Sequence, residues 1–168
     1  MGKVQNIFDN GGPGTVSRSI DDVIISVKNA GADAIPFGAP VFMTSDGAVP
    51  FNSSDPQDFA TFLGFAVRVA DKTPETYPEG QFNAAGSQAG VWKAGDVMEV
   101  LVRGGITVAL ATQGAKGNMV RIRKSDGRLT TSPGAENTTI ALENVRVRNQ
   151  RRTDGTCAEV IVNTRNLI

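Results

Sequence analysis

Three short motifs place glycine, serine or lysine at spacings close to those of catalytic and phosphate-binding loops. GGPGTVS (residues 11–17) begins like the phosphate loop G-x-G-x-x-G, but Ser17 takes the place of the last glycine and no strand precedes it. QGAKGN (113–118) has lysine and glycine in the reverse of the P-loop order. GSQAG (86–90) lacks the G-x-S-x-G spacing around its serine. We therefore interpret all three motifs as turns or hinges.

The titratable residues also lack the partners that catalysis requires. The chain has no histidine, which excludes Ser-His-Asp and Cys-His nucleophile systems and histidine metal sites. Its single cysteine, Cys157, lies in an apolar, strand-like stretch and is interpreted as a small buried residue. The adjacent carboxylates Asp21 and Asp22 are expected at the entrance to a strand. We predict no enzymatic activity, no catalytic residue, no metal site and no cofactor.

Positive charge gathers late in the chain. Residues 1–100 hold 6 Lys/Arg and 12 Asp/Glu, whereas residues 101–168 hold 11 and 5, so the two halves are complementary, either within one subunit or between copies. All aromatic residues lie at or before Trp92, although single-strand nucleic-acid binders interleave aromatic and basic side chains. We therefore predict no nucleic-acid partner. The late arginines are expected either to be solvated or to face an acidic protein surface; four of them lie within seven residues, Arg146, Arg148, Arg151 and Arg152.

The elements that must position these side chains are short strands separated by turns. VWKAGDVMEVLVRGGITVAL (91–110) alternates apolar and polar residues and predicts a β-hairpin with its turn at Gly104-Gly105. Residues 55–70 also fit a helical period, but Gly64 and the valines that follow favour a strand from about residue 61, after a short turn. The fold class predicted is all-β, mainly antiparallel, a compact barrel or sandwich with little helix. Further strands are expected at 22–29, 38–43, 48–51, 118–124, 139–149 and 157–164.

The first residues read as an arm. The turn-forming cluster DNGGPGT (9–15) separates a few apolar residues from the strands, which predicts an extended arm over 1–15 and a single β-rich domain over 16–168. The segment before this cluster has too few apolar residues to be a signal peptide, and no apolar run is long enough to span a bilayer. We expect no membrane association and a cytosolic site of assembly.

Several segments, taken in order, resemble one family. The sequence is similar to the capsid cement, or head decoration, proteins of tailed bacteriophages, and the similarity runs from about residue 15 to near the end of the chain. The arginine-rich stretch 146–152 has no counterpart in the pattern. The similarity is carried by IPFGAPVFM (35–43), FLGFAVRVA (62–70), VWKAGDVMEVLVRGGITVAL (91–110), AKGNMVRIRKSDGR (115–128) and CAEVIVN (157–163).

The resemblance implies a virion structural protein. Such a protein coats the outside of the mature icosahedral capsid after assembly in the bacterial cytoplasm, and it cements neighbouring major capsid protein subunits against internal DNA pressure. A homodimer or homotrimer is implied. The alternatives are another phage structural component, such as a tail or head-completion protein, or a β-barrel module that binds nucleic acid or glycan. We expect contacts with capsid or sister subunits from the arm residues Val4, Ile7 and Phe8 and from Arg146, Arg148, Arg151 and Arg152.

Overall fold

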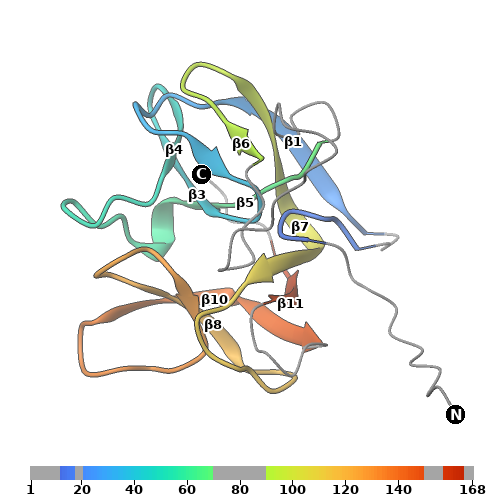
Figure 1. Ribbon diagram of the computed structural model, residues 1–168, viewed down its shortest axis with the longest axis vertical. Helices are drawn as coiled ribbons and strands as arrows, with labels where there is room; N and C mark the ends of the chain where they lie inside the picture. Colours follow the sequence, from blue (N-terminus) through green and yellow to red (C-terminus); the bar gives the residue numbers. More distant parts are fainter. Residues whose placement is uncertain (1–11, 18–20, 70–89, 150–156, 165–168) are drawn as a thin grey trace, which may run out of the picture.

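The computed structural model describes residues 12–17, 21–69, 90–149 and 157–164 (Figure 1). These residues form β-strands and a single turn of 3₁₀ helix, which confirms the all-β, mainly antiparallel prediction. Apart from the hairpin predicted over 91–110, the predicted strands are confirmed, with small shifts at their ends. The elements are β1 (Val23–Lys28), β2 (Ile35–Pro36), β3 (Pro40–Thr44), β4 (Gly47–Pro50), η1 (Phe59–Thr61), β5 (Phe62–Ala66), β6 (Val91–Trp92), β7 (Val97–Ala109), β8 (Met119–Arg123), β9 (Leu129–Thr130), β10 (Thr139–Asn149) and β11 (Cys157–Val162).

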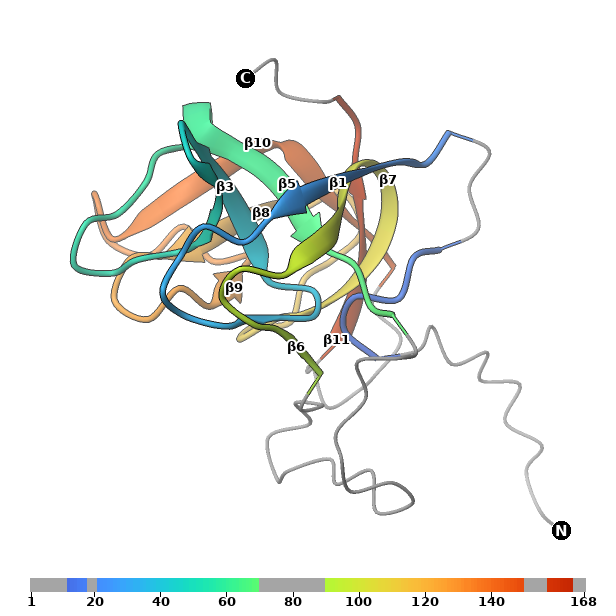
Figure 2. The ribbon, with the colours of Figure 1, turned by 90° about the horizontal axis from the view of Figure 1, so that it is seen from above.

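The strands make two lobes, which Figures 1 and 2 show from two sides. In the first lobe the order is β1-β7-β5-β3-β4, and the Ala30 amide donates to the Ala48 carbonyl (2.8 Å) to bring the two ends together. In the second lobe the order is β7-β11-β10-β8-β9, and the Ala111 amide donates to the Leu129 carbonyl (2.7 Å). Each lobe is therefore a small sheet that curls back on itself. β2 and β6 form a separate two-stranded ladder beside the first lobe.

Strand β7 belongs to both lobes, so the predicted hairpin over 91–110 is wrong. Its residues Val97–Arg103 pair with β1, and its residues Gly104–Ala109 pair with β11. Gly104 and Gly105 lie in the middle of this single strand, where the pairing passes from one partner to the other. Two successive glycines fit a hairpin turn locally, but here the strand continues because long-range partners exist on both sides of them.

The core explains the continuous apolar run FLGFA. All five residues of β5 are buried, because one face packs inside the first lobe and the other packs against the second. Leu63 belongs to the cluster inside the first lobe, whereas Phe62 and Phe65 join the cluster that fills the second. Their rings meet edge to face, with centroids 5.3 Å apart. The predicted strand is thus confirmed, and the helix-like pattern before it yields only η1.

A buried asparagine after β1 is hydrogen-bonded to the segment that joins β6 to β7. The Asn29 side-chain amide donates to the carbonyls of Asp33 (3.0 Å), Trp92 (3.3 Å) and Lys93 (3.1 Å), and its oxygen accepts from the Gly31 amide (3.0 Å). Asn29 has no exposed surface, so these bonds compensate the cost of burying its amide. They hold the turn after β1 against the chain that enters β7.

Residues 12–17 lie along the second half of β7. The Gly14 and Thr15 backbones bond to Thr107, and the Ser17 amide donates to the Gly105 carbonyl (2.8 Å). Gly14 fits only because it has no side chain: a Cβ there would lie 2.8 Å from the Phe37 Cβ. The end of the predicted arm is therefore part of the folded body. Residues 1–11 lie outside the described residues, and the proposed arm remains a prediction for them.

Gly104→Ala should destabilise the protein more than an ordinary turn glycine does. Gly104 has φ +118°, and an added Cβ would lie 1.9 Å from Asp22 Oδ1 and 3.0 Å from Asp22 Cα. The positive φ alone costs about 1–3 kcal/mol, and the clash adds to it. Gly117→Ala is the control, because its φ is +88° but nothing lies within 4 Å of the added Cβ. Thermal unfolding of both variants measures the difference. Equal losses of stability would show that the passage between lobes does not require Gly104.

Candidate contact surfaces

The outer surface of the second lobe carries a group of arginine and apolar side chains on three neighbouring strands. On β10, Arg146 lies opposite Met119 of β8 on one side and opposite Ile161 of β11 on the other. All three side chains are partly exposed, so an arginine stands between two accessible apolar residues. Arg121 lies two residues beyond Met119 on the same face of β8. We call Met119, Arg121, Arg146 and Ile161 the basic face.

The Arg146 guanidinium is held in place by main-chain carbonyls. Its Nη1 donates to the Glu143 carbonyl (2.8 Å) and to the Val145 carbonyl (3.0 Å). These bonds orient the group without neutralising its charge, because a carbonyl carries none. A planar guanidinium with remaining donors suits a carboxylate on another molecule.

Arg148 has a different environment. Its Nη1 lies 3.2 Å from Glu159 Oε1 on β11, so its charge is already balanced within the subunit. Half of the Arg148 side chain is exposed, and such a pair contributes little to stability. Of the seven predicted contact residues, the structure thus places Arg146 and Arg148 on one strand. The other five, Val4, Ile7, Phe8, Arg151 and Arg152, lie outside the described residues.

Sequence reasoning did not select Arg121, Met119 or Ile161. Met119 and Arg121 alternate with the buried residues Val120 and Ile122, and this alternation is the signal that places them on the outside of a strand. Their meeting with Arg146 depends on the ladder register, which includes a shift between Leu142 and Arg146. No local pattern predicts such a shift. Cys157, expected to be buried, is partly exposed in β11.

The division of charge along the sequence becomes a division in space. Among the described residues, 21–69 and 90–103 belong to the first lobe and hold 4 Lys/Arg and 8 Asp/Glu, whereas 104–149 and 157–164 belong to the second and hold 7 and 4. The pairs Arg123–Asp126 and Arg148–Glu159 lie within the second lobe, and Arg103–Asp21 (3.7 Å) lies where β1 begins beside β7. The described parts of the two lobes therefore differ in the sign of their net charge.

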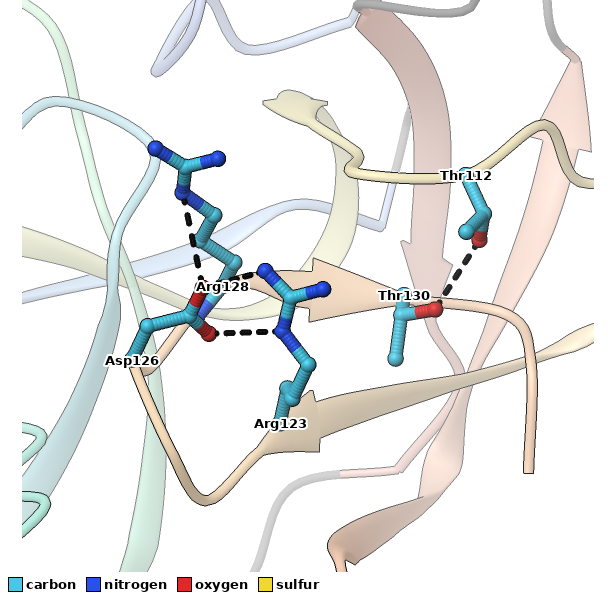
Figure 3. Close-up of polar contacts among 5 residues, drawn as sticks. All are labelled: Thr112, Arg123, Asp126, Arg128 and Thr130. Atoms are coloured by element: carbon cyan, nitrogen blue, oxygen red, sulfur yellow. Dashed lines mark hydrogen bonds and ion pairs between the residues drawn. The ribbon is translucent and has the colours of Figure 1, made fainter. Parts of the chain in front are cut away.

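The turn after β8 contains a carboxylate whose pKa clearly departs from its ordinary value. Asp126 accepts from Arg123 Nε (2.8 Å) and Nη2, and Arg128 Nε lies 3.7 Å away (Figure 3). The hydrogen bonds from Arg123 lower the pKa of Asp126 below 3.8, against a small opposing effect of burial. This carboxylate is consequently ionised at neutral pH and organises the Ser-Asp-Gly turn.

Beside this turn lies an open hollow of about 540 Å³ with hydroxyl groups on its walls. Thr112 and Thr130 both line it, and their Oγ1 atoms are 2.9 Å apart (Figure 3). A hydroxyl needs a neighbouring base to act as a nucleophile, and the chain has no histidine. Within the described residues, no three His, Cys, Asp or Glu side chains gather to bind a metal. Among the described residues, no helix is long and apolar enough to span a bilayer.

Two curled sheets share strand β7, and partly exposed charged and apolar side chains lie on the outer surface of the second lobe. Residues 2–163 match the family described as structural cement protein (E217 gp24/Pam3 gp6), so the chain belongs to the phage structural cement proteins. This is not an enzyme family, which confirms the prediction of a non-enzymatic virion structural protein.

A solved structure shares the fold. A chain of "The capsid of Myoviridae Phage XM1" superposes with a TM-score of 0.70 and 18% sequence identity, over 94% of this chain and 98% of that chain. No curated protein sequence matches this one. At this sequence identity the comparison shows a shared fold only. The shared fold extends over nearly the whole length of both chains.

Asp126→Asn should lower the melting temperature slightly at neutral pH, because the ion pairs to Arg123 and Arg128 are lost. The pKa of Asp126 is lowered in the folded state, so its stabilisation is present above the ordinary value of 3.8 and disappears as pH falls through the lowered pKa. The melting temperatures of wild type and variant should therefore converge in acid. Asp46→Asn, in the other Ser-Asp-Gly turn, is the matched control. A difference that stays as large in acid as at neutral pH would contradict the assignment.

Proposed function

We propose that this cement protein binds the outer surface of the mature capsid, bridges neighbouring major capsid protein subunits and holds them against the pressure of packaged DNA. It acts as a homodimer or homotrimer on the virion exterior, after assembly in the host cytoplasm. Its membership of the structural cement family supports this role. The basic face is the observation that carries the mode of binding, because Arg146 keeps its charge available beside two partly exposed apolar side chains.

The chemistry of the basic face specifies the partner surface. Arginine and methionine are enriched at protein interfaces, where the apolar residues exclude water and the arginine bonds a carboxylate. The partner is therefore a capsid surface that presents carboxylates around a small apolar centre. Arg151 and Arg152 follow β10 in sequence, and we assign them to the same contact.

A rigid body suits this task. One contact of modest area binds weakly, but an oligomer that engages several capsid subunits gains affinity through effective concentration. That gain requires contact surfaces held at fixed separations. Strand β7 supplies the stiffness here, because it is hydrogen-bonded into both lobes.

Arg146→Glu should weaken binding to undecorated, expanded heads by about tenfold or more. The substitution replaces the arginine that bonds a capsid carboxylate with a glutamate that repels it. Arg121→Glu should have a similar effect, and binding by both variants should lose its dependence on salt. Lys93→Glu is the control, because Lys93 is an exposed cation of the first lobe. Sedimentation of heads with bound protein, followed by electron microscopy, measures occupancy. Equal occupancy for Arg146→Glu and Lys93→Glu would refute the basic face as a capsid contact.

Deletion of residues 2–10 should leave a folded protein that occupies capsids poorly. The deletion ends before Gly12, whose carbonyl accepts from the Thr15 amide (3.1 Å), so the contacts of residues 12–17 with β7 are kept. We assign the anchoring contacts to Val4, Ile7 and Phe8, and the triple substitution of these residues by serine should reproduce the loss. Thermal unfolding checks the fold. Unchanged occupancy after the deletion would eliminate the arm as a contact.

A further inference from the structure

Among the described residues, strand β1 has a strand partner on one side only. Its pairs all belong to β7, from Val23–Arg103 to Lys28–Val97. Strand β4 approaches only beyond the end of β1, where the Ala30 amide donates to the Ala48 carbonyl. The second edge of β1 therefore offers backbone donors and acceptors that the described strands do not use. Figure 1 shows β1 along the margin of the first lobe, beside β7.

This edge has little of the protection with which proteins prevent edge pairing: a register irregularity between Val23 and Ile24, and a lysine only at its last residue. Its sequence, VIISVK, has no proline and no charge before its last residue, Lys28. The β-branched residues favour an extended chain. Ile24 is 42% exposed on the outward face, one of two large apolar side chains with such exposure in the described structure. An edge without protection of this kind is a template for another strand.

The ends of β1 carry opposite charges. Asp21 and Asp22 precede the strand, and Lys28 ends it. Within the subunit Asp21 lies 3.7 Å from Arg103, and Asp22 accepts from the Gly105 amide (3.2 Å). Lys28 of a second copy would join these contacts. A second β1 in antiparallel orientation, with the Ile25 residues facing each other, places Lys28 of each copy beside the two aspartates of the other. A parallel copy would bring like charges together. The edge is thus self-complementary under a two-fold axis, as an isologous interface requires.

We propose that two copies of this chain pair through β1, antiparallel, so that the sheet of the first lobe continues from one subunit into the next. This contact gives the homodimer, one of the two oligomers named in the proposed function. Its role in capsid binding rests on that function, whereas its existence can be tested on the protein alone. Main-chain hydrogen bonds supply the affinity, as in strand addition generally, and the terminal charges fix the direction. The basic faces lie on the second lobes and stay outside this contact.

The test is the mass of the purified protein in solution, without capsids. Light scattering and sedimentation should give a dimer for the wild type. Ile24→Lys should raise its dissociation constant by about tenfold or more, because a lysine on an edge strand opposes pairing. Lys28→Glu should act in the same direction by placing like charges together. Val97→Thr is the control: Val97 is 67% exposed on the same outward face, but it lies on β7, away from the edge, and threonine adds no charge opposite Lys28. Circular dichroism verifies that each variant is folded.

Other outcomes overturn the proposal. A wild-type monomer, or a trimer, would exclude a two-fold pair through β1. So would a dimer that Ile24→Lys and Lys28→Glu leave as stable as Val97→Thr does. A monomer in which the β1 amides exchange slowly, and exchange faster after deletion of residues 2–10, would show that the chain's own arm occupies the edge. None of these results bears on capsid binding, which the variants of the basic face test separately.

Discussion

The structure depends on one strand that must satisfy two sets of partners. Backbone amides and carbonyls buried in the interior need hydrogen bonds, and β7 provides them for β1 and β5 in the first lobe and for β11 in the second. Where the partners change, the neighbouring chain comes so close that Gly104 has no room for a side chain. The positive φ of that glycine and the Asp22 carboxylate beside it are both consequences of joining two curled sheets through a single continuous strand.

The sequence predicted the strands well and their connections poorly. Alternation in 22–29, 118–124 and 139–149 reports which residues face a core, and the structure confirms these strands. The FLGFA run is buried on both faces, which local hydrophobicity also indicates. The error at Gly104-Gly105 has a physical cause. A hairpin turn and a tight crossing between sheets both need glycine, and they differ only in which distant strands are available to pair.

The contact surface was predictable only in part, because its residues come together through the pairing of strands that are distant in sequence. The clustering of Arg146 and Arg148 is a property of the sequence, whereas the position of Met119, Arg121 and Ile161 around Arg146 arises from three ladders and a register shift. Sequence reasoning also treated the arginines as equivalent. The structure separates them, because Glu159 balances Arg148 while Arg146 bonds only to carbonyls among its described contacts. The difference lies in strand β11, distant in sequence from both arginines.

In our proposal the two lobes make different contacts. The net positive charge of the described second lobe favours its approach to an acidic capsid surface. The first lobe meets a second copy through the β1 edge, where the opposite charges at the two ends of the strand offset the repulsion between two lobes of like net charge. Because β7 is shared, a continuous hydrogen-bonded ladder holds the two proposed contacts at a fixed separation. A flexible linker between the lobes would keep both contacts but lose the fixed separation on which the gain in effective concentration depends.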